Sequence, residues 1–369
     1  MKLRCYGYDA VFANLFPPIV AEAEKRGHEK PIVPPHGVRG VAAEWKDEMR
    51  DCDVALVGLS SYQTQEEVAF LEALQRVIII ADVPTSELRP KAQKWVQAQR
   101  DLPMSQRKLK GLLLALEASR GAAIRFGYPP EDIYYLGPPP HWGASYRQMV
   151  DIDLPVVRLQ LRKRRGEDEP ERLADDDFLV YVPGTKITPV VNAMLRGTIE
   201  TCREIFGDKF VLGFAPHPGE KPESPEEEVP FAAAVAERQQ LLKGLALADV
   251  VKIRNPQRYA LADLVVMSGG PNETISGAYA RNDRMAYYRD ENTIAALAAS
   301  GVGGGKWFVA ELGGAYAFGS ESFREAIRFV TSPEGRVHIR AQQEKNFPLP
   351  ETWDTAPAIV DFLEEVAGM

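Results

Sequence analysis

One segment of the sequence, ADLVVMSGGPNETISGAYA at 262–280, joins an apolar run to a helical pattern through two glycines. Ser268 ends the apolar run, and Gly269 and Gly270 allow the backbone to turn sharply and to approach a ligand closely. The backbone N–H groups at a helix start, together with the helix dipole, favour a phosphate group. The segment therefore predicts a phosphate-binding turn. Its alternative is a plain strand-to-helix turn with Glu273 on the surface.

Three further residues of this segment are candidates for contacts to the same ligand. Asn272, Glu273 and Thr274 fall in the first turn of the predicted helix. The hydroxyl groups of Ser268 and Thr274 could donate hydrogen bonds to a phosphate. Phosphate repels a carboxylate, so Glu273 is expected to face a neutral group such as the hydroxyls of a ribose.

Two other loops follow predicted strands in the same half of the chain. In FAPHPGEK, His217 lies between two prolines on a stiff loop, where its imidazole can contact a phosphate or a sugar hydroxyl. In VPGTKIT, at 182–188, Gly184 follows a strand, and Thr185 and Lys186 can reach a phosphate. The order Thr-Lys excludes a P-loop, which requires Gly-Lys followed by Ser or Thr. The alternative for both loops is a surface connection.

Polar side chains also follow apolar runs in the N-terminal half. Asp82 ends the run RVIIIAD, and a carboxylate there could be a general base or could orient a sugar hydroxyl. Asp82 and His217 are therefore the candidate catalytic residues. The remaining candidates, for sugar or acceptor contacts, are Tyr8, Asp9, Ser60, Ser61, Arg89, Arg289 and Glu291. Helix capping by Ser60 and ordinary connecting loops are the structural alternatives.

An alternation of strands and helices is needed to position these loops. Short apolar runs typical of buried parallel strands occur at 53–60, 76–82 and 178–185, with amphipathic helical patterns between such runs. Two series of this kind predict two doubly wound α/β halves with parallel sheets. Ligands of such folds bind beyond the carboxyl ends of the strands, and two halves would bind a ligand in the cleft between them.

Other segments carry weaker patterns. The sequence predicts one or two helices over 94–119, two short strands over 121–139, a strand over 249–256, and helices over 320–331 and 354–367. A highly charged stretch over 146–177 is the candidate link between the halves, and RLQLRKRR within it is interpreted as a solvated helix end and loop. We therefore expect an N-terminal domain over 1–165 and a nucleotide-binding domain over 176–345.

Composition limits the possible functions. The 369 residues have a formal net charge of -8, which argues against broad nucleic-acid binding. No apolar run approaches the ~20 residues that span a bilayer, and the start of the chain lacks a cleavage-like signal. These features predict a cytoplasmic protein without a transmembrane segment. Its three cysteines are widely scattered and its five histidines form no ligand pattern, so neither a disulfide framework nor a metal site is expected.

The motifs of the second half resemble those of the non-hydrolysing UDP-N-acetylglucosamine 2-epimerases. SGGPNE at 268–273 resembles the S-G-G-x-x-E motif of that family, and FAPHPGEK resembles its His-containing P-V-H-x-N-P loop. YYRDENTIAALAASGV is similar to the stretch after the next strand, where Arg-Asp is followed by Glu. The order and spacing agree across roughly 178–305. The wider class is the GT-B fold of glycosyltransferases, in which two Rossmann-like domains face a cleft that holds a nucleotide sugar.

The resemblance implies roles for several residues. Ser268, Gly269 and Gly270 would bind the diphosphate, Glu273 the ribose hydroxyls, and His217 would face the phosphate or the sugar. The segment IRFGYPPEDIYYLGPPPHW is similar to the end of the first domain in this class. Residues 346–369 would then form a C-terminal helix that crosses back onto the N-terminal domain. The epimerases of this family are dimers, so the resemblance also suggests a homodimer.

The N-terminal half departs from the epimerase pattern. Their strand-end H-G-D-T motif would fall on Gly58 to Ser61, where no aspartate is present, and their H-V-E-A-G-L-R motif resembles ADVPTSELR only loosely, with Asp82 in place of the glutamate. The first hypothesis is therefore a glycosyltransferase-like enzyme with a UDP-sugar in the inter-domain cleft, an unknown acceptor, and neither a metal nor a tightly bound cofactor. The alternatives are a sugar-nucleotide epimerase or hydrolase, and a GT-B protein that binds nucleotide or sugar without turnover.

Overall fold

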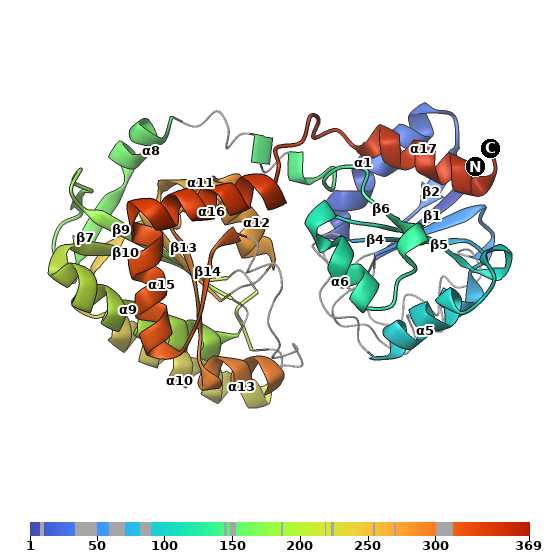
Figure 1. The fold of residues 1–369 in the computed structure, drawn as a ribbon. Helices are drawn as coiled ribbons and strands as arrows, with labels where there is room; N and C mark the ends of the chain where they lie inside the picture. Colours follow the sequence, from blue (N-terminus) through green and yellow to red (C-terminus); the bar gives the residue numbers. More distant parts are fainter. Residues whose placement is uncertain are drawn as a thin grey trace. The chain divides into compact units, whose positions relative to one another are not determined.

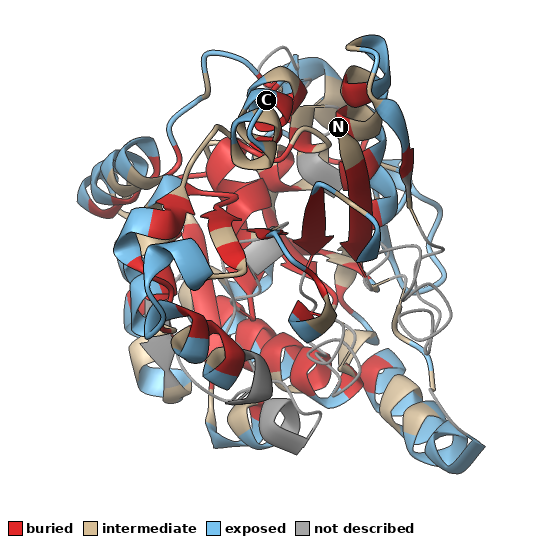
Figure 2. Cartoon of the chain, turned by 90° about the vertical axis from the view of Figure 1, so that its right-hand side faces the viewer, coloured by how far each residue is buried: buried red, intermediate tan, exposed pale blue. Residues whose placement is uncertain are grey.

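The computed structural model divides the chain into two compact units. It describes residues 1–7, 11–33, 50–58, 71–81, 90–143, 146–147, 153–185, 187–217, 219–222, 225–253, 255–268, 271–299 and 313–369. The N-terminal unit consists of Met1–Arg147 together with Pro350–Met369, and the C-terminal unit consists of Gln148–Leu349. In each unit, helices flank a central sheet (Figure 1). Figure 2 shows the strands as mainly buried, whereas the helices expose their outer sides.

The sheet of the N-terminal unit is parallel throughout the part of it that the structure describes. Its strands are β1 (Lys2–Gly7), β2 (Glu29–Ile32), β3 (Val54–Gly58), β4 (Val77–Ile80), β5 (Leu109–Leu113) and β6 (Ile133–Tyr134), in the order β2-β1-β3-β4-β5-β6. The chain thus proceeds to one side from β1 to β2 and to the other side from β3 onward. Doubly wound sheets bind their ligands where the strand order reverses in this way.

Helices cover both faces of this sheet. They are α1 (Phe12–Lys25), α5 (Pro90–Arg100), α6 (Arg120–Arg125) and α17 (Ala356–Ala367), with short 3-10 turns at Met104–Gln106, Glu117–Ser119 and Pro130–Asp132. Helix α17, from the end of the chain, packs on α1, where His28 Nε2 lies 2.6 Å from Glu364 Oε1 and Arg26 donates to the same carboxylate. The last helix therefore completes the N-terminal unit, as the resemblance implied.

The ring of Phe12 lies directly against the ends of β1 and β3. Gly7 and Gly58 are paired across these strands, and a Cβ on either residue would lie 2.3 Å and 2.0 Å, respectively, from the Phe12 ring. Phe12 is fully buried and stacks on Phe16, with 5.2 Å between ring centroids. Because a packed ring cannot move aside cheaply, both positions require glycine for steric reasons.

We expect Gly58→Ala to lower the free energy of unfolding by about 1–3 kcal/mol, the usual cost of overpacking a core. The substitution Phe12→Leu should relieve part of this cost, so a double-mutant cycle should show favourable coupling between the two changes. The matched control is Gly121→Ala in α6, whose added Cβ would meet only Arg125 NH1 at 3.7 Å. Urea unfolding measures the stability of the four proteins of the cycle and of the control. An equal effect of the two glycine substitutions would contradict the steric argument.

The C-terminal unit contains an eight-stranded sheet in its described part. Six parallel strands are β9 (Phe178–Pro183), β10 (Phe210–Ala215), β11 (Ala246–Ala248), β12 (Leu264–Met267), β13 (Met285–Arg289) and β14 (Ala315–Phe318), and an antiparallel edge is formed by β7 (Arg162–Arg165) and β8 (Glu171–Arg172). The order is β14-β13-β12-β9-β10-β11-β7-β8. The six parallel strands therefore follow the 3-2-1-4-5-6 order of the Rossmann fold.

Alternate residues of these strands supply two separate cores. Val180 and Val182 of β9 pack on one face of the sheet, and Leu179 and Tyr181 pack on the other. The helices of this unit are α8 (Leu154–Gln160), α9 (Thr188–Phe206), α10 (Pro225–Leu242), α11 (Asn255–Leu261), α12 (Pro271–Tyr279), α13 (Glu291–Ala299), α15 (Gly319–Thr331) and α16 (Pro333–Asn346), with a 3-10 turn at Gly207–Lys209. A sheet buried on both faces explains the almost continuous apolar runs of its strands.

Several elements differ from those predicted from sequence. Residues 109–113 form strand β5 within a segment predicted as helical, because a short apolar run fits either structure and the pairing with β4 and β6 decides. Residues 121–139 contain helix α6 and one strand rather than two strands. The strand predicted at 249–256 lies earlier, at Ala246–Ala248, and 162–165 pair with it as an edge strand rather than ending a helix.

A further helix, α16, was not predicted. Its first turn determines where the helix begins: the Ser332 hydroxyl accepts from the Gly335 N–H at 3.0 Å, and Pro333 directly follows Ser332.

His141 of the N-terminal unit is a half-buried, uncharged histidine. Burial lowers its pKa from 6.5 to about 4, and its Nδ1 has no hydrogen-bond partner in the described part of the chain. The unfolded chain therefore binds a proton near pH 6.5 that the folded chain takes up only near pH 4. Between these values, stability falls as the pH falls.

We expect His141→Phe to reduce the loss of unfolding free energy between pH 7 and pH 4, because the variant lacks the group that must be protonated. Urea unfolding of both proteins at several pH values tests this. Equal pH dependence in the two proteins would show that His141 does not contribute to the acid sensitivity.

Candidate functional site

The carboxyl ends of four parallel strands meet at one edge of the sheet in the C-terminal unit. Strand β9 lies between β10 and β12, and the chain order reverses between β9 and β12. Gly184 follows β9 and Ser268 follows β12, so both lie at this reversal. Crevices of doubly wound sheets form at this position.

The loops after β9 and β10 are in direct backbone contact. The Gly184 N–H donates to the Ala215 carbonyl at 2.8 Å. A Cβ on Gly184 would lie 2.6 Å from the backbone nitrogen of His217 and 2.9 Å from Pro216 Cα. Thr185 closes its own loop, since its hydroxyl accepts from the Ile187 N–H at 3.1 Å. Gly184 thus allows the chain carrying His217 to lie against the end of β9.

The imidazole of His217 has a defined tautomer when neutral. Its Nδ1 accepts a hydrogen bond from the Gly219 N–H at 2.9 Å, which leaves the ring proton on Nε2. The Glu220 N–H donates to the His217 carbonyl at 2.9 Å and holds the same turn from the other side. His217 is half-buried, and the arrangement presents Nε2 as a hydrogen-bond donor.

A buried ion pair anchors this loop to α10. Arg238 NH1 lies 2.6 Å from Glu220 Oε1, with side chains that are 9% and 2% exposed, and the guanidinium also lies 5.1 Å above the ring of Phe214. Neither residue of the pair was predicted from sequence, because the two partners lie 18 positions apart in no recognisable pattern. The pair fixes the turn that contains His217.

Ser268, directly after β12, and Glu273, in the first turn of α12, contact one another. The Ser268 hydroxyl donates to Glu273 Oε2 at 3.3 Å, and Ser268 is almost fully buried. This contact holds the carboxylate of the first helical turn beside the end of the strand. A carboxylate in this position can accept hydrogen bonds from two neighbouring hydroxyl groups.

Arg289 holds the end of β12 from the adjacent strand. It is 1% exposed, and its Nε donates to the Ser268 carbonyl at 3.2 Å. A guanidinium buried this deeply keeps its charge, so it also makes the edge of the sheet more positive.

The side chain of Thr274 is directed into the protein core. It is fully buried, and its hydroxyl accepts from Tyr287 at 3.1 Å. Burial raises the pKa of Tyr287, which therefore stays a neutral donor. The contact attaches α12 to β13. We therefore leave the Thr274 hydroxyl out of the ligand contacts considered below.

The helix after β13 begins with a reciprocal cap. Asp290 accepts from the Thr293 N–H at 2.7 Å, and the Thr293 hydroxyl accepts from the Asp290 N–H at 2.8 Å. Tyr288 donates to the same carboxylate, and its pKa is raised to about 12 by burial and by the charge of Asp290. Glu291 is exposed in the first turn of α13.

The other predicted site residues lie outside the described part of the chain. They are Tyr8, Asp9, Ser60, Ser61, Asp82, Arg89, Lys186, Gly269 and Gly270, and the side chain of Asn272. The strands that precede them are present, since β1 ends at Gly7, β3 at Gly58 and β4 at Ile80. Within the residues that are described, no three His, Cys, Asp or Glu side chains are grouped closely enough to hold a metal ion. No described helix is long and apolar enough to cross a membrane.

The structure is similar to solved enzymes of the GT-B class. It matches UDP-GlcNAc 2-epimerase from Methanocaldococcus jannaschii in complex with UDP-GlcNAc and UDP with a TM-score of 0.55 and 14% identity, covering 99% of this chain and 100% of that one. It matches the Neisseria meningitidis UDP-GlcNAc 2-epimerase bound to UDP-GlcNAc with a TM-score of 0.53 and 12% identity, covering 99% and 100%. It matches the wall teichoic acid polymerase TagF with a TM-score of 0.53 and 12% identity, covering 100% and 89%.

At this level of identity the similarity shows the fold. The two parallel-sheet α/β units are those of the GT-B class, which confirms the class that the sequence motifs suggested. No protein-family model matches the sequence, and no curated protein sequence matches it either.

We expect Arg238→Met to lower the free energy of unfolding by about 3–5 kcal/mol, because it leaves the Glu220 carboxylate buried without its partner. Glu220→Gln in the same background should restore much of this stability by removing the buried charge. The matched control is Arg196→Met, which breaks an exposed ion pair with Glu237 and should cost at most about 1 kcal/mol. Urea unfolding measures the series. Similar costs for the two arginine substitutions would contradict an anchoring role.

Proposed function

We propose that this chain is a glycosyltransferase-like enzyme whose C-terminal unit binds the nucleoside diphosphate of a UDP-sugar at the carboxyl ends of β9 and β12. The observation that carries the proposal is the contact between Ser268 and Glu273 at the reversal of strand order. It combines a carboxylate suited to ribose hydroxyls with a Gly-Gly turn and a helix start suited to phosphate. The solved structures with this fold include epimerases bound to UDP-GlcNAc or UDP.

The phosphate groups would lie between the starts of α9 and α12. Both helices begin after strands that end at this edge, so their N–H groups and dipoles favour negative charge there. The buried guanidinium of Arg289 adds positive potential from beneath the turn. These groups would stabilise the charge that develops on the leaving diphosphate, without a metal ion in the proposed scheme.

His217 would act on the opposite side of the phosphates. Its Nδ1 is held by Gly219, so Nε2 would donate to a phosphate or sugar oxygen. The acceptor is proposed to bind to the N-terminal unit, with Asp82 as the general base that removes its proton.

A second candidate is epimerisation of the sugar nucleotide. It is favoured by the similarity of the complete chain to UDP-GlcNAc 2-epimerases. Against it stands the sequence after β3, Gly58-Leu-Ser-Ser, which provides no carboxylate where the epimerase motif has one. Since epimerisation requires groups that remove and return a proton at C2, we rank transfer first.

Glu273→Gln is expected to weaken UDP binding about 10- to 100-fold, the effect of losing a charge-assisted hydrogen bond of ~1.5–3 kcal/mol. Calorimetric titration with UDP measures the change. Glu334→Gln is the matched control, because Glu334 is an exposed glutamate in the first turn of α16 in the same unit. If Glu273→Gln and Glu334→Gln bind UDP equally well, Glu273 does not contact the ribose.

Measuring the products formed from UDP-GlcNAc distinguishes transfer from epimerisation, hydrolysis and binding without turnover. Wild-type protein is incubated with UDP-GlcNAc alone and with panels of sugar and polyol acceptors, and NMR follows the C2 and anomeric signals. Release of UDP that depends on an acceptor supports transfer. Inversion at C2, or release of UDP without an acceptor, would replace transfer by epimerisation or hydrolysis. UDP binding with no product under any condition would replace it by a binding function.

A further inference from the structure

A pocket lies at the edge of the same sheet opposite to the candidate nucleotide site. It has a volume of about 660 Å³ and is lined by residues of the C-terminal unit, including Asp263 before β12 and Arg284 before β13. These residues precede the strands whose far ends carry Ser268 and Arg289. At ~3.3 Å per residue, the five steps from Asp263 to Ser268 separate the two edges by about 16 Å. The pocket is therefore distinct from the proposed nucleotide site.

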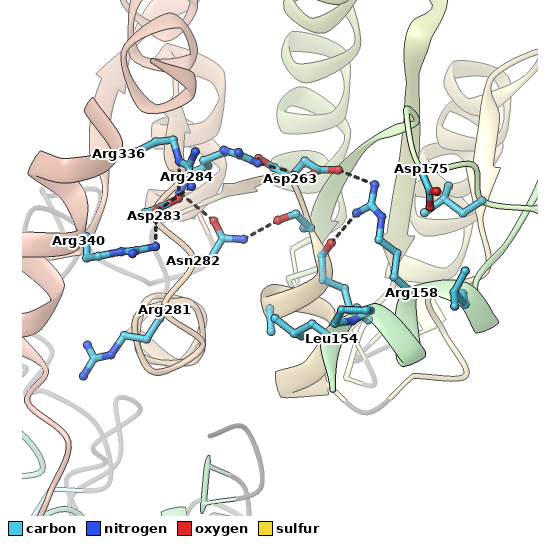
Figure 3. Close-up of a pocket in the computed structure, with 16 residues that line it drawn as sticks. Leu154, Arg158, Asp175, Asp263, Arg281, Asn282, Asp283, Arg284, Arg336 and Arg340 are labelled. Carbon is cyan, nitrogen blue, oxygen red and sulfur yellow. Dashed lines mark hydrogen bonds and ion pairs between the residues drawn. The ribbon is translucent and has the colours of Figure 1, made fainter. Parts of the chain in front are cut away.

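Arginine side chains dominate the pocket. In Figure 3, the labelled charged residues are Arg158, Asp175, Asp263, Arg281, Asp283, Arg284, Arg336 and Arg340. Five arginines and three aspartates give the lining a net positive charge of two, in a chain whose overall charge is -8. A positive, concave site on an acidic protein favours anions locally.

Two of the aspartates orient four of these arginines and neutralise only half of their charge. Asp283 accepts from Arg336 at 3.0 Å and from Arg340 at 2.6 Å. Asp263 is shared in the same way by Arg284, at 3.3 Å, and Arg158, at 2.9 Å. Each carboxylate thus serves two guanidinium groups and leaves one positive charge in excess. The ion pairs also fix the arginines before any ligand binds, which lowers the entropic cost of binding.

Arg281 is held in the pocket by an unusual backbone conformation. Its φ is 54°, the left-handed region usually occupied by glycine at a helix end. The Asn282 N–H closes the end of α12 on the Gly277 carbonyl at 3.1 Å. Arg281 NH1 is buried and has no hydrogen-bond partner in the described residues. Burial lowers the pKa of Arg281, and the charge of Glu344 opposes only part of this effect, so a bound anion would further offset the cost of burial.

One wall of the pocket is apolar. Its lining includes Leu154 and Leu159 of α8, Leu173, and Leu261 of α11. Figure 3 shows Leu154 on the side away from Arg281 and Arg340. Leu173 and Leu261 are buried, whereas Leu159 is 53% exposed. Inorganic phosphate alone would leave this wall unused, so a ligand with an organic group fits the pocket better.

We propose that this pocket binds a small phosphorylated organic molecule, with its phosphate on Arg281 and Arg340 and its organic group against the leucines. It is a second ligand site, separate from the nucleotide site, and it does not depend on the function proposed above. Guanidinium groups suit phosphate because their N–H donors match its oxygens in pairs.

The test is calorimetric titration with phenyl phosphate and with inorganic phosphate, each with and without saturating UDP. We expect one phenyl phosphate per chain, tighter binding than inorganic phosphate, and no competition by UDP. Arg281→Asn should weaken phenyl phosphate binding at least about 10-fold. Asparagine tolerates a positive φ, so this variant removes the cation while keeping the backbone conformation.

Two further variants complete the experiment. Arg340→Gln should also weaken phenyl phosphate binding, while Arg336 continues to hold Asp283, and this gives a second measurement should Arg281→Asn fold poorly. Arg328→Gln is the matched control, since Arg328 is a 60% exposed arginine on α15 outside the pocket. Unchanged phenyl phosphate affinity in both pocket variants, competition by UDP, or no binding to the wild-type protein would overturn the proposal. Failure of UDP to bind would instead count against the proposed function alone.

Discussion

The C-terminal unit depends on one constraint, the parallel pairing of β9 with β10 on one side and β12 on the other. The order of the strands reverses at this position, so Gly184 and Ser268 lie at the same edge of the sheet, where doubly wound folds bind their ligands. The close approach of Gly184 to the backbone of His217 is possible only because Gly184 has no Cβ. The position of His217 is therefore set by backbone packing, and its tautomer is set by a backbone N–H. A side chain placed in this way loses little freedom when a ligand binds.

Buried charged side chains hold the backbone at this edge of the sheet in place. Arg289 holds the carbonyl of Ser268, and Arg238 pairs with Glu220 beneath the His217 loop. Replacing such a pair by apolar residues is often neutral or stabilising, so stability alone does not account for keeping it. Both arginines act on loops whose residues are candidates for ligand contact. Their shared effect is to fix loop geometry, and Arg289 also brings a positive charge to the predicted phosphate site.

Local sequence patterns indicated candidate residues at this edge of the sheet, and long-range strand pairing determined which segments lie beside them. The run LVVMSGG predicted a strand and a turn because continuous apolar residues followed by two glycines have few other structures. The parallel order of the strands followed from the alternation with helices. The sequence did not predict which strands would be neighbours. The adjacent strands β9 and β12, for example, come from segments about 80 residues apart. Strand β5 was missed for the same reason: its five residues form a strand because β4 and β6 lie beside them.

The side chains at the two edges of the C-terminal sheet show the same limit of prediction from local sequence. The pattern assigned Ser268 and Glu273 to one segment of the candidate site, and the structure shows that these two side chains are in contact. Glu220 with Arg238, and Asp283 with Arg340, come from separate elements, so only the folded chain shows these contacts. Thr274 lies on the predicted turn, but helix geometry directs its hydroxyl toward Tyr287.

The two edges of the sheet are connected by the rigid strands β12 and β13. Asp263 and Arg284 lie at the amino ends of these strands, and Ser268 and Arg289 lie at their carboxyl ends. Helix α12 makes a second connection, because it begins at the candidate nucleotide site and ends beside Arg281. Its dipole favours negative charge at its start. At its end, the left-handed residue allows the chain to turn into the arginine pocket. These shared elements hold the candidate nucleotide site and the arginine pocket apart at a fixed separation, and this is why UDP and phenyl phosphate are expected to bind without competing.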